Sequence, residues 1–490
     1  MQFDNIKNRA NYYLIFYFLL NISILLIGII YLNFCKGYQR IDVKIWELIG
    51  LFIFVTGSII WIRIENNILS AWMIFLLLSY MYWFGQPFLD LFGILPKLAE
   101  LNSYSNESLV AALVYQCCGM GFMHLGAIFY KTRNINKAVK TVEIFRFEDI
   151  SLRKAVNKIA LGMFISSAPY IFVNLGQRVY TSVTYGYLAL YQTQKQPNGV
   201  LGSLYNIISS LSILFIPSLF FLLAANKDNK KFKLFLYIIF GIFILGSLYI
   251  GDRSVSMGLS LCLLLFYHCS IKPFKQKRFI LLVFIGLMFV IIVPSAGKLR
   301  GMEARTFSDV FVVIGKTITQ DNFIISTLTS MGFSLFPMVK TIELIPKVQD
   351  YSYGVEYIAT VLAIIPSIIL FGYSFTSIAA LPDWLKSNLH MDYGPGYSII
   401  AESYYNFGWL GLPIMSIFGY IIQKYFTNKK HYSEKVLYDA QICIILYFLT
   451  LVIRNSLTLF FRNVFYGIII PIILIKLLYN WEKRNGEIYE

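Results

Sequence analysis

The residue best suited to acid–base chemistry in this sequence is Glu402, which follows the glycine-rich segment Gly394-Pro-Gly-Tyr. Asn406 lies four positions later, so on a helix the two side chains share one face. A carboxyl group on such a face serves as a general base when partial burial moves its pKa toward working pH. The alternative is a charge that only balances the helix dipole. His390 is a second candidate base, and Tyr404 and Asn406 are candidate substrate contacts.

Arginines at the ends of apolar runs form a second group of candidates. Arg253 follows Asp252 in a tight turn, and Arg300 and Arg305 lie close together after another run. Guanidinium groups match phosphate oxygens and keep their charge when desolvated. These three are therefore candidate anion ligands. The alternatives are an Asp252–Arg253 pair that marks a helix end and an ordinary solvated loop.

Three further arginines lie at similar positions: Arg178, Arg454 and Arg462. They are candidate substrate ligands that would hold a diphosphate. The alternative is that their side chains only extend from a helix end toward water.

No motif in the sequence indicates a metal, a cofactor or a nucleotide. The six cysteines have no metal-ligand spacing, and most lie in apolar runs where they pack as small hydrophobes. There is no Walker loop and no His/Cys cluster typical of zinc or haem. The net charge of +16 has no accompanying nucleic-acid motif. We expect neither a metal, a cofactor nor a nucleic-acid partner.

The elements that position these residues must be membrane helices. Of the 490 residues, 57% are apolar and only 14% are charged, with a mean hydropathy of +0.64. A soluble chain carries about 25% charged residues, so soluble domains are excluded. The first apolar run is long enough to span a membrane and has no cleavage site after it, so we interpret it as a retained helix.

Apolar runs of spanning length predict an all-α, polytopic membrane protein of about twelve transmembrane helices. The runs are 12–34, 45–62, 68–85, 108–130, 158–176, 201–225, 234–250, 255–269, 279–295, 406–425, 437–454 and 459–479.

Cations predict the orientation. With both termini in the cytoplasm, the density of Lys and Arg is about threefold higher in the inner segments than in the outer ones, as the positive-inside rule requires. The predicted organisation is nine helices in 1–295, a long extracytoplasmic loop with short helices in 296–405, and three helices with a cytoplasmic tail in 406–490. The apolar stretch 357–373 inside the loop is interpreted as re-entrant or interfacial rather than as a further span.

Several segments resemble one family of membrane enzymes. They are Gly-Asp-Arg253 with the apolar helix ending Phe-Tyr-His268, the arginine-bearing loop entrance, Tyr351-Ser-Tyr-Gly354, and the segment from Gly394 to Gly408. Over about residues 170 to 470 the order of these features resembles the bacterial O-antigen and capsular polysaccharide polymerases of the Wzy type, with a fold similar to the GT-C-like glycosyltransferases.

The resemblance implies a glycosyl transfer at the outer face of the membrane. Undecaprenyl-diphosphate-linked oligosaccharide would be both donor and acceptor, with no metal or cofactor. The expected partners are membrane lipid, a chain-length regulator and a flippase. It implies that Arg253 and Arg300 stabilise the leaving diphosphate and that Glu402 is the base. The remaining alternatives are a lipid-linked oligosaccharide flippase, for which the sequence lacks two similar halves, and an O-antigen ligase.

Overall fold

The computed structural model describes most of the chain. The described residues are 2–65, 67–140, 150–185, 188–191, 199–274, 312–313, 315, 322–366, 369–370, 373–391, 394–427 and 435–486. Within these ranges the chain forms helices and no strand, which confirms the all-α fold class.

The long and short α-helices have the following bounds: α1 (Gln2–Phe34), α2 (Arg40–Glu65), α3 (Ala71–Trp83), α4 (Gly85–Leu91), α5 (Asn106–Lys140), α6 (Ile150–Thr184), α7 (Gly199–Ser210), α8 (Phe215–Ala225), α9 (Lys230–Ile250), α10 (Arg253–Phe266), α13 (Phe323–Gly332), α14 (Phe336–Leu344), α15 (Val355–Leu362), α16 (Thr376–Ala379), α17 (Leu381–Asn388), α18 (Ile399–Phe407), α19 (Leu412–Thr427), α20 (Lys435–Val452), α21 (Leu457–Val464) and α22 (Ile470–Gly486). Tighter or wider helical turns join them at η1 (Glu100–Ser103), η3 (Leu188–Tyr191), η4 (Leu211–Leu214), η5 (Tyr267–Ile271), η6 (Phe333–Leu335), η7 (Gly408–Gly411) and η9 (Phe465–Ile469).

The described part of the chain contains nine helical stretches that are long and apolar enough to cross a membrane, and two shorter apolar helices, α3 and Leu437–Val452. All eleven overlap runs predicted from the sequence. The twelfth predicted run, 279–295, lies outside the described residues. The chain is therefore a multi-pass membrane protein, and the count of twelve stays a prediction.

Contacts divide the chain into two units, each made of three segments. Unit 1 comprises Met1–Glu143, Leu328–Lys430 and Val452–Phe461. Unit 2 comprises Ile144–Thr327, His431–Leu451 and Arg462–Glu490.

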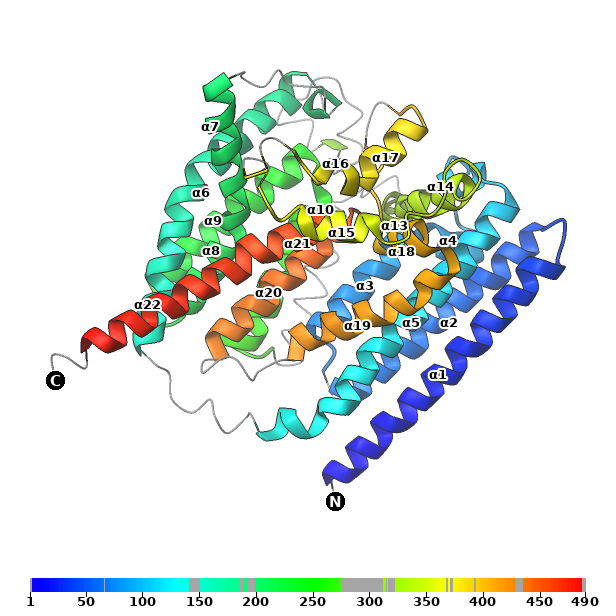
Figure 1. Cartoon of the computed structure of the whole chain (residues 1–490), viewed down its shortest axis with the longest axis horizontal. Coiled ribbons are helices and arrows are strands. Elements are labelled where there is room, and N and C mark those ends of the chain that lie inside the picture. The colour runs from blue at the N-terminus through cyan, green and yellow to red at the C-terminus, as the bar shows by residue number, and fades with distance from the viewer. Residues whose placement is uncertain are drawn as a thin grey trace. The chain divides into compact units, whose positions relative to one another are not determined.

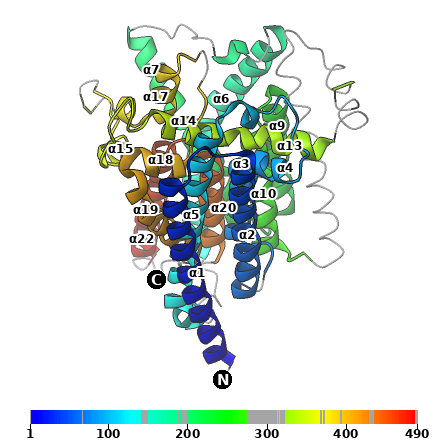
Figure 2. The same cartoon turned by 90° about the vertical axis from the view of Figure 1, so that its right-hand side faces the viewer.

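In unit 1, helices α1, α2 and α19 pack along α5, as Figures 1 and 2 show from two sides. Glycines bring α5 and α19 close together. A Cβ added at Gly126 would lie 1.8 Å from the carbonyl oxygen of Ser416, and one added at Gly419 would lie 1.9 Å from that of Met123. A side chain at either position would force the helices apart, so these glycines allow the close packing of α5 against α19.

In unit 2, α6 packs against α8, α9 and α22, and α9 packs against α10. The turn between α9 and α10 requires glycine, because Gly251 has a φ of +98° in the left-handed region. This turn places Asp252 and Arg253 at the start of α10.

The described part of the predicted loop, 296–405, consists mainly of the short helices α13 to α17, of which the longest has ten residues. None of these five is among the nine candidate spans. Among the described residues of the apolar stretch 357–373, those up to Leu362 belong to α15, and a turn follows.

Candidate functional site

The helix that carries Glu402 is fixed at both ends by local signals. The side chain of Ser398 accepts a hydrogen bond from the amide of Ala401 at 3.1 Å and caps the start of α18. Gly408 ends the helix with a φ of +55°. Gly396 precedes the cap with a φ of +80°, and a Cβ there would lie 2.6 Å from the carbonyl oxygen of Arg454. The glycine-rich sequence therefore lets the chain enter α18 directly against the segment that precedes α21.

Glu402 lies in a buried pair with a second carboxyl group, that of Glu356 in α15. The exposed fractions are 0% for Glu402, 1% for Glu356 and 0% for Asn406. Asn406 Nδ2 donates to Glu356 Oε2 and to the carbonyl oxygen of Glu402, both at 2.9 Å. Glu402 Oε2 accepts from the amide of Leu457 at 3.0 Å, and the carboxyl groups of Glu402 and Glu356 also share a hydrogen bond. We call Glu356 and Glu402 the carboxyl pair.

A row of hydroxyl groups leads away from the carboxyl pair. Thr360 Oγ1 lies 2.7 Å from Glu356 Oε1 and 2.8 Å from Thr458 Oγ1. Thr458 Oγ1 donates to the carbonyl oxygen of Ala379 at 3.1 Å. Three segments far apart in the sequence thus meet at α15, since α16 and α21 each supply one member of the row.

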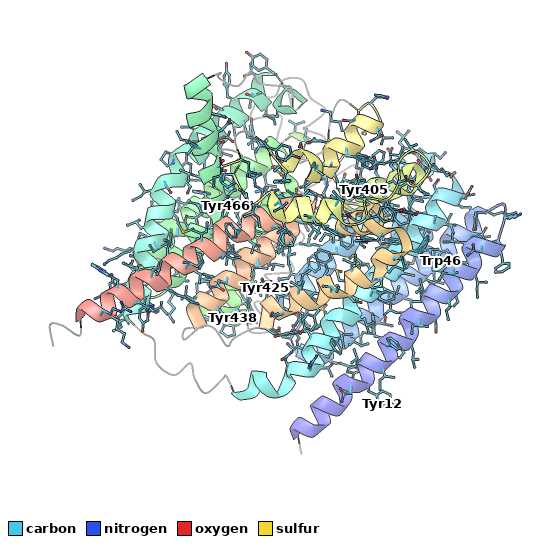
Figure 3. The ribbon with its side chains drawn as sticks, viewed as in Figure 1. Tyr12, Trp46, Tyr405, Tyr425, Tyr438 and Tyr466 are labelled. Atoms are coloured by element: carbon cyan, nitrogen blue, oxygen red, sulfur yellow. The ribbon has the colours of Figure 1, made fainter. Side chains whose placement is uncertain are left out.

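Two tyrosines of α18 pack against aromatic rings of other segments. Tyr405, which Figure 3 labels, accepts a hydrogen bond from Gln349 at 3.0 Å, and its ring lies 4.8 Å from that of Trp384. Tyr404 packs edge-on against Tyr115, with ring centroids 5.0 Å apart. These contacts hold α18 against its neighbours, and the carboxyl pair is itself buried.

The electrostatics of the pair are dominated by burial. Burial raises the pKa of Glu356 above its ordinary value of 4.5. Burial also raises the pKa of the neighbouring Tyr357 and Tyr397 hydroxyls well above 10. Within the described part of the chain, no lysine, arginine or histidine forms an ion pair with either carboxyl group. The site is therefore acidic but poor in positive charge.

Among the predicted residues, Glu402, Asn406, Tyr404 and Arg454 all belong to unit 1. The carbonyl oxygen of Arg454 accepts the amide of Tyr397 at 2.9 Å. Its guanidinium lies 6.0 Å from the ring centroid of Tyr82. Arg454 thus lies three residues before the amide that binds Glu402, and its side chain contacts an aromatic ring.

The remaining predicted residues differ in how far the structure describes them. His390 is exposed, with a φ of +50°. In unit 2, Arg178 lies 3.8 Å from Asp252, and Arg462 is half-buried with its Nε unpartnered. Arg253 begins α10, and its side chain is outside the described residues, as are Arg300 and Arg305 entirely.

Glu356, Thr360 and Thr458 were not among the residues predicted from the sequence. Glu356 and Thr360 are four residues apart at the start of an apolar stretch, a spacing that places both on one helix face. That signal was available in the sequence, whereas nothing there indicates which helix Thr458 meets. Among the described residues, no group of three or more His, Cys, Asp or Glu side chains is placed to hold a metal ion.

Among the comparisons with known proteins, one family model matches the chain. The family model described as O-antigen polysaccharide polymerase Wzy matches residues 12–485, nearly the whole chain. No curated protein and no solved structure matches it significantly. The match confirms the family that the sequence resembles, and with it a membrane protein of polysaccharide biosynthesis that transfers glycosyl groups. The chain belongs to the O-antigen polysaccharide polymerase Wzy family.

Proposed function

We propose that this chain joins oligosaccharide repeat units carried on undecaprenyl diphosphate into O-antigen or capsular polysaccharide, at the outer face of the bacterial cytoplasmic membrane. The observation that carries the proposal, in a chain of this family, is the pair of buried carboxyl groups of Glu402 and Glu356, which share a hydrogen bond. A buried carboxyl group beside a second one is suited to exchange a proton with a substrate hydroxyl.

The proposed reaction is a single displacement. The acceptor sugar hydroxyl attacks the anomeric carbon of the donor glycan, the bond from that carbon to the diphosphate oxygen breaks, and the hydroxyl proton passes to Glu402. The electron pair of the broken bond leaves with undecaprenyl diphosphate. Inversion at the anomeric carbon follows from one displacement, and no metal is needed if arginines hold the diphosphate.

Access to Glu402 requires movement of the groups that cover it. Its carboxyl group has no exposed surface, and the amide of Leu457 and α15 lie against it. We propose that acceptor binding displaces α15, whose exposed side includes Val355 and Ile358. A dry site strengthens the attraction between the base and the proton that it accepts.

The assignment of arginines remains as the sequence predicts it. Arg253 and Arg300 are proposed to stabilise the leaving diphosphate, with Arg305, Arg178, Arg454 and Arg462 as further ligands. Arg454 has structural support, because its backbone contacts the turn that enters α18. His390 is proposed as an alternative base, and Tyr404 and Asn406 as positions near the sugar. Both termini are proposed to be cytoplasmic, with a chain-length regulator and a flippase as partners.

The test is polymer formation by the purified protein. Radiolabelled lipid-linked repeat units, incubated with the protein in vesicles, are expected to give a ladder of longer glycans without ATP and in the presence of a chelator. Glu402→Ala is expected to abolish the ladder. Movement of unchanged substrate across the vesicle membrane, with no ladder, would contradict a polymerase and favour a flippase.

A matched control lies in the same unit. Glu343 of α14 pairs with Lys340 at 2.7 Å and has a side chain 30% exposed. Glu343→Gln removes a carboxylate without touching the carboxyl pair, and we expect a normal ladder from it. Loss of the ladder in both variants would contradict the assignment of Glu402.

A further inference from the structure

The hydrogen bond between the two members of the carboxyl pair requires a proton. A carboxylate has no hydrogen to donate, and two carboxylates side by side repel each other. The bond that Glu356 and Glu402 share therefore needs one of the two groups to be a carboxylic acid. The other hydrogen bonds of each group indicate which one carries the proton.

Glu356 has the surroundings of a carboxylate. Thr360 Oγ1 donates to its Oε1 at 2.7 Å, and Asn406 Nδ2 donates to its Oε2 at 2.9 Å. The hydrogen bond with Glu402 is the third. Burial raises the pKa of Glu356, and these three hydrogen bonds oppose the rise because each stabilises the charged form. A proton on Glu356 would weaken the acceptor that all three donors use.

Glu402 has the surroundings of a neutral acid. Apart from the bond with Glu356, its side chain accepts one hydrogen bond among the described residues, from the amide of Leu457 at 3.0 Å. Its exposed fraction is 0%, and no cation pairs with it in the part of the chain that the structure describes. A buried carboxyl group with so few donors is more stable protonated, which makes it the donor of the shared bond.

We infer that the carboxyl pair holds one proton, that Glu402 carries it and donates it to the Glu356 carboxylate, and that Glu356 receives it when Glu402 takes a proton from the acceptor hydroxyl. The inference rests on the proposed function for the role of Glu402. Glu356 acts through Glu402 and not on the substrate, so it is a positioning residue. The location of the proton stands on the hydrogen bonds and the burial of the two groups.

The proton transfer balances. The O–H bond of the acceptor sugar breaks as its oxygen bonds to the anomeric carbon, and the proton joins one oxygen of Glu402. The O–H bond at the other oxygen of Glu402 breaks, and that proton joins Glu356. The leaving diphosphate takes the electron pair of the bond that it loses. The pair thus changes from one proton and one negative charge to two protons and no charge.

The other titratable groups around the pair are phenols. They are Tyr357 on α15, Tyr397 before α18 and Tyr405 on α18. Burial raises the pKa of the Tyr357 and Tyr397 hydroxyls well above 10, so both stay protonated at neutral pH. A protonated phenol does not take a further proton. Among these described neighbours of Glu402, the Glu356 carboxylate is therefore the group that can accept its proton.

The location of the proton is tested by infrared spectroscopy of the purified protein at neutral pH. We expect a carbonyl stretching band of a protonated carboxylic acid, shifted in D₂O, that Glu402→Gln removes. Glu356→Gln is expected to keep this band at a shifted wavenumber, because Glu402 stays buried without a cation, and Glu343→Gln to leave it unchanged. Survival of the band in Glu402→Gln, or its loss in Glu356→Gln, would overturn the inference.

A second variant covers the case in which Glu356→Gln does not fold. Thr360→Val removes one donor to Glu356 and leaves its carboxylate a stronger acceptor for Glu402. The band is then expected at a lower wavenumber, because a stronger hydrogen bond weakens the carbonyl bond of the acid. A proton on Glu356 would instead give a higher wavenumber, since the lost hydrogen bond was its own. That result, or an unmoved band, would overturn the inference.

The passage of the proton to Glu356 is tested by the rate of polymer formation. Glu356→Gln is expected to lose at least about 100-fold, since Glu402 has no carboxylate to receive its proton. Glu356→Asp keeps a carboxylate on a shorter side chain and is expected to be at least about tenfold faster than Glu356→Gln. A merely structural role predicts the opposite order, because glutamine has the length of glutamate and aspartate does not.

The two tests fail separately from the proposed function. A Glu356→Gln variant at least as fast as Glu356→Asp, with similar unfolding temperatures for both, would refute the passage of the proton. The infrared measurement needs no substrate. A wild-type protein that forms no polymer, with the infrared bands as expected, would refute the proposed function and leave the location of the proton in place.

Discussion

Unit 1 contains two pairs of neighbouring carboxyl groups, and only one of these pairs has an arginine beside it. Near the start of α2, Arg40 Nη2 lies 2.9 Å from Asp90 Oδ1, and both of these charges act on Glu47, which has no exposed surface. The carboxyl pair of Glu356 and Glu402 has no such cation among the described residues. Burial of a carboxyl group costs less free energy when an arginine lies beside it, or when it is protonated, than when it is an unpaired charge.

Asp90 is paired with an arginine, whereas Glu356 and Glu402 have no cation beside them among the described residues. An arginine fixes the charge of its partner over the whole physiological range of pH, because a guanidinium does not lose its proton. A pair that is neutralised by a proton gains or loses that proton as its surroundings change. The second arrangement suits general base catalysis, and the first suits the packing of α2 against α4.

The largest effect is expected when a third carboxyl group is introduced beside Glu356 and Glu402, the pair that has no cation. Asn406→Asp removes the amide that donates to Glu356 and to the carbonyl oxygen of Glu402, and it places a carboxyl group beside them. We expect the free energy of unfolding to fall by about 3–5 kcal/mol, the cost of an uncompensated buried charge. Thermal unfolding in detergent measures it. Asn406→Ala is the control, with an expected loss of about 1–3 kcal/mol from the missing hydrogen bonds; equal losses would contradict the account.

Removal of the cation from the other pair is expected to cost less. Arg40→Met leaves Asp90 and Glu47 without their arginine, but the Arg40 side chain is 35% exposed, so water replaces part of the interaction. We expect a loss of about 2 kcal/mol, between the values for exposed and buried pairs. The double variant Arg40→Met/Asp90→Asn is expected to recover most of it. Failure to recover would show that Arg40 acts by packing alone.

The stability of Glu356→Gln is expected to depend on pH in a defined direction. Folding raises the pKa of Glu356, so the folded state binds the proton more tightly than the unfolded state. The wild-type protein therefore loses stability as pH rises above about 4.5, by up to about 1.4 kcal/mol per unit until the folded pKa is passed. Glutamine has no proton to lose. The melting temperature of the variant, relative to the wild type, should increase from pH 5 to pH 8, and a constant difference would contradict a raised pKa.

The smallest effect is expected at an ion pair on the surface of α14. Lys340 and Glu343 have side chains 26% and 30% exposed and lie three positions apart. Such pairs contribute about 0.5 kcal/mol or less. Glu343→Gln should change the melting temperature by no more than the error of the measurement. A larger loss would mean that substitution of any glutamate in this region is damaging, and the comparison of the two pairs would lose its force.

Local signals in the sequence predicted a large part of this structure. Runs of spanning length predicted the helices because a membrane interior leaves the backbone few other ways to satisfy its hydrogen bonds. The four-residue spacing of Glu402 and Asn406 predicted a shared helix, and the glycines before it predicted a tight entry. Each of these features is decided within a few residues of chain.

The partners of Glu402 could not be predicted in the same way. Glu356 lies 46 positions earlier, and Leu457 and Thr458 lie more than 50 positions later, so the site depends on how three segments pack. No periodicity in one segment encodes its neighbours in another. The pairing of Arg40 with Asp90 could not be predicted either, because it joins the start of α2 to a different segment, α4.

The most direct measurement is the initial rate of polymer formation by Glu402→Gln and Glu47→Gln, each purified and supplied with the same lipid-linked repeat units. Both substitutions replace a fully buried carboxyl group by an amide of the same shape. The account predicts a loss of at least about 100-fold for Glu402→Gln, the usual contribution of a general base, and a rate close to wild type for Glu47→Gln. Equal rates for the two variants would contradict it.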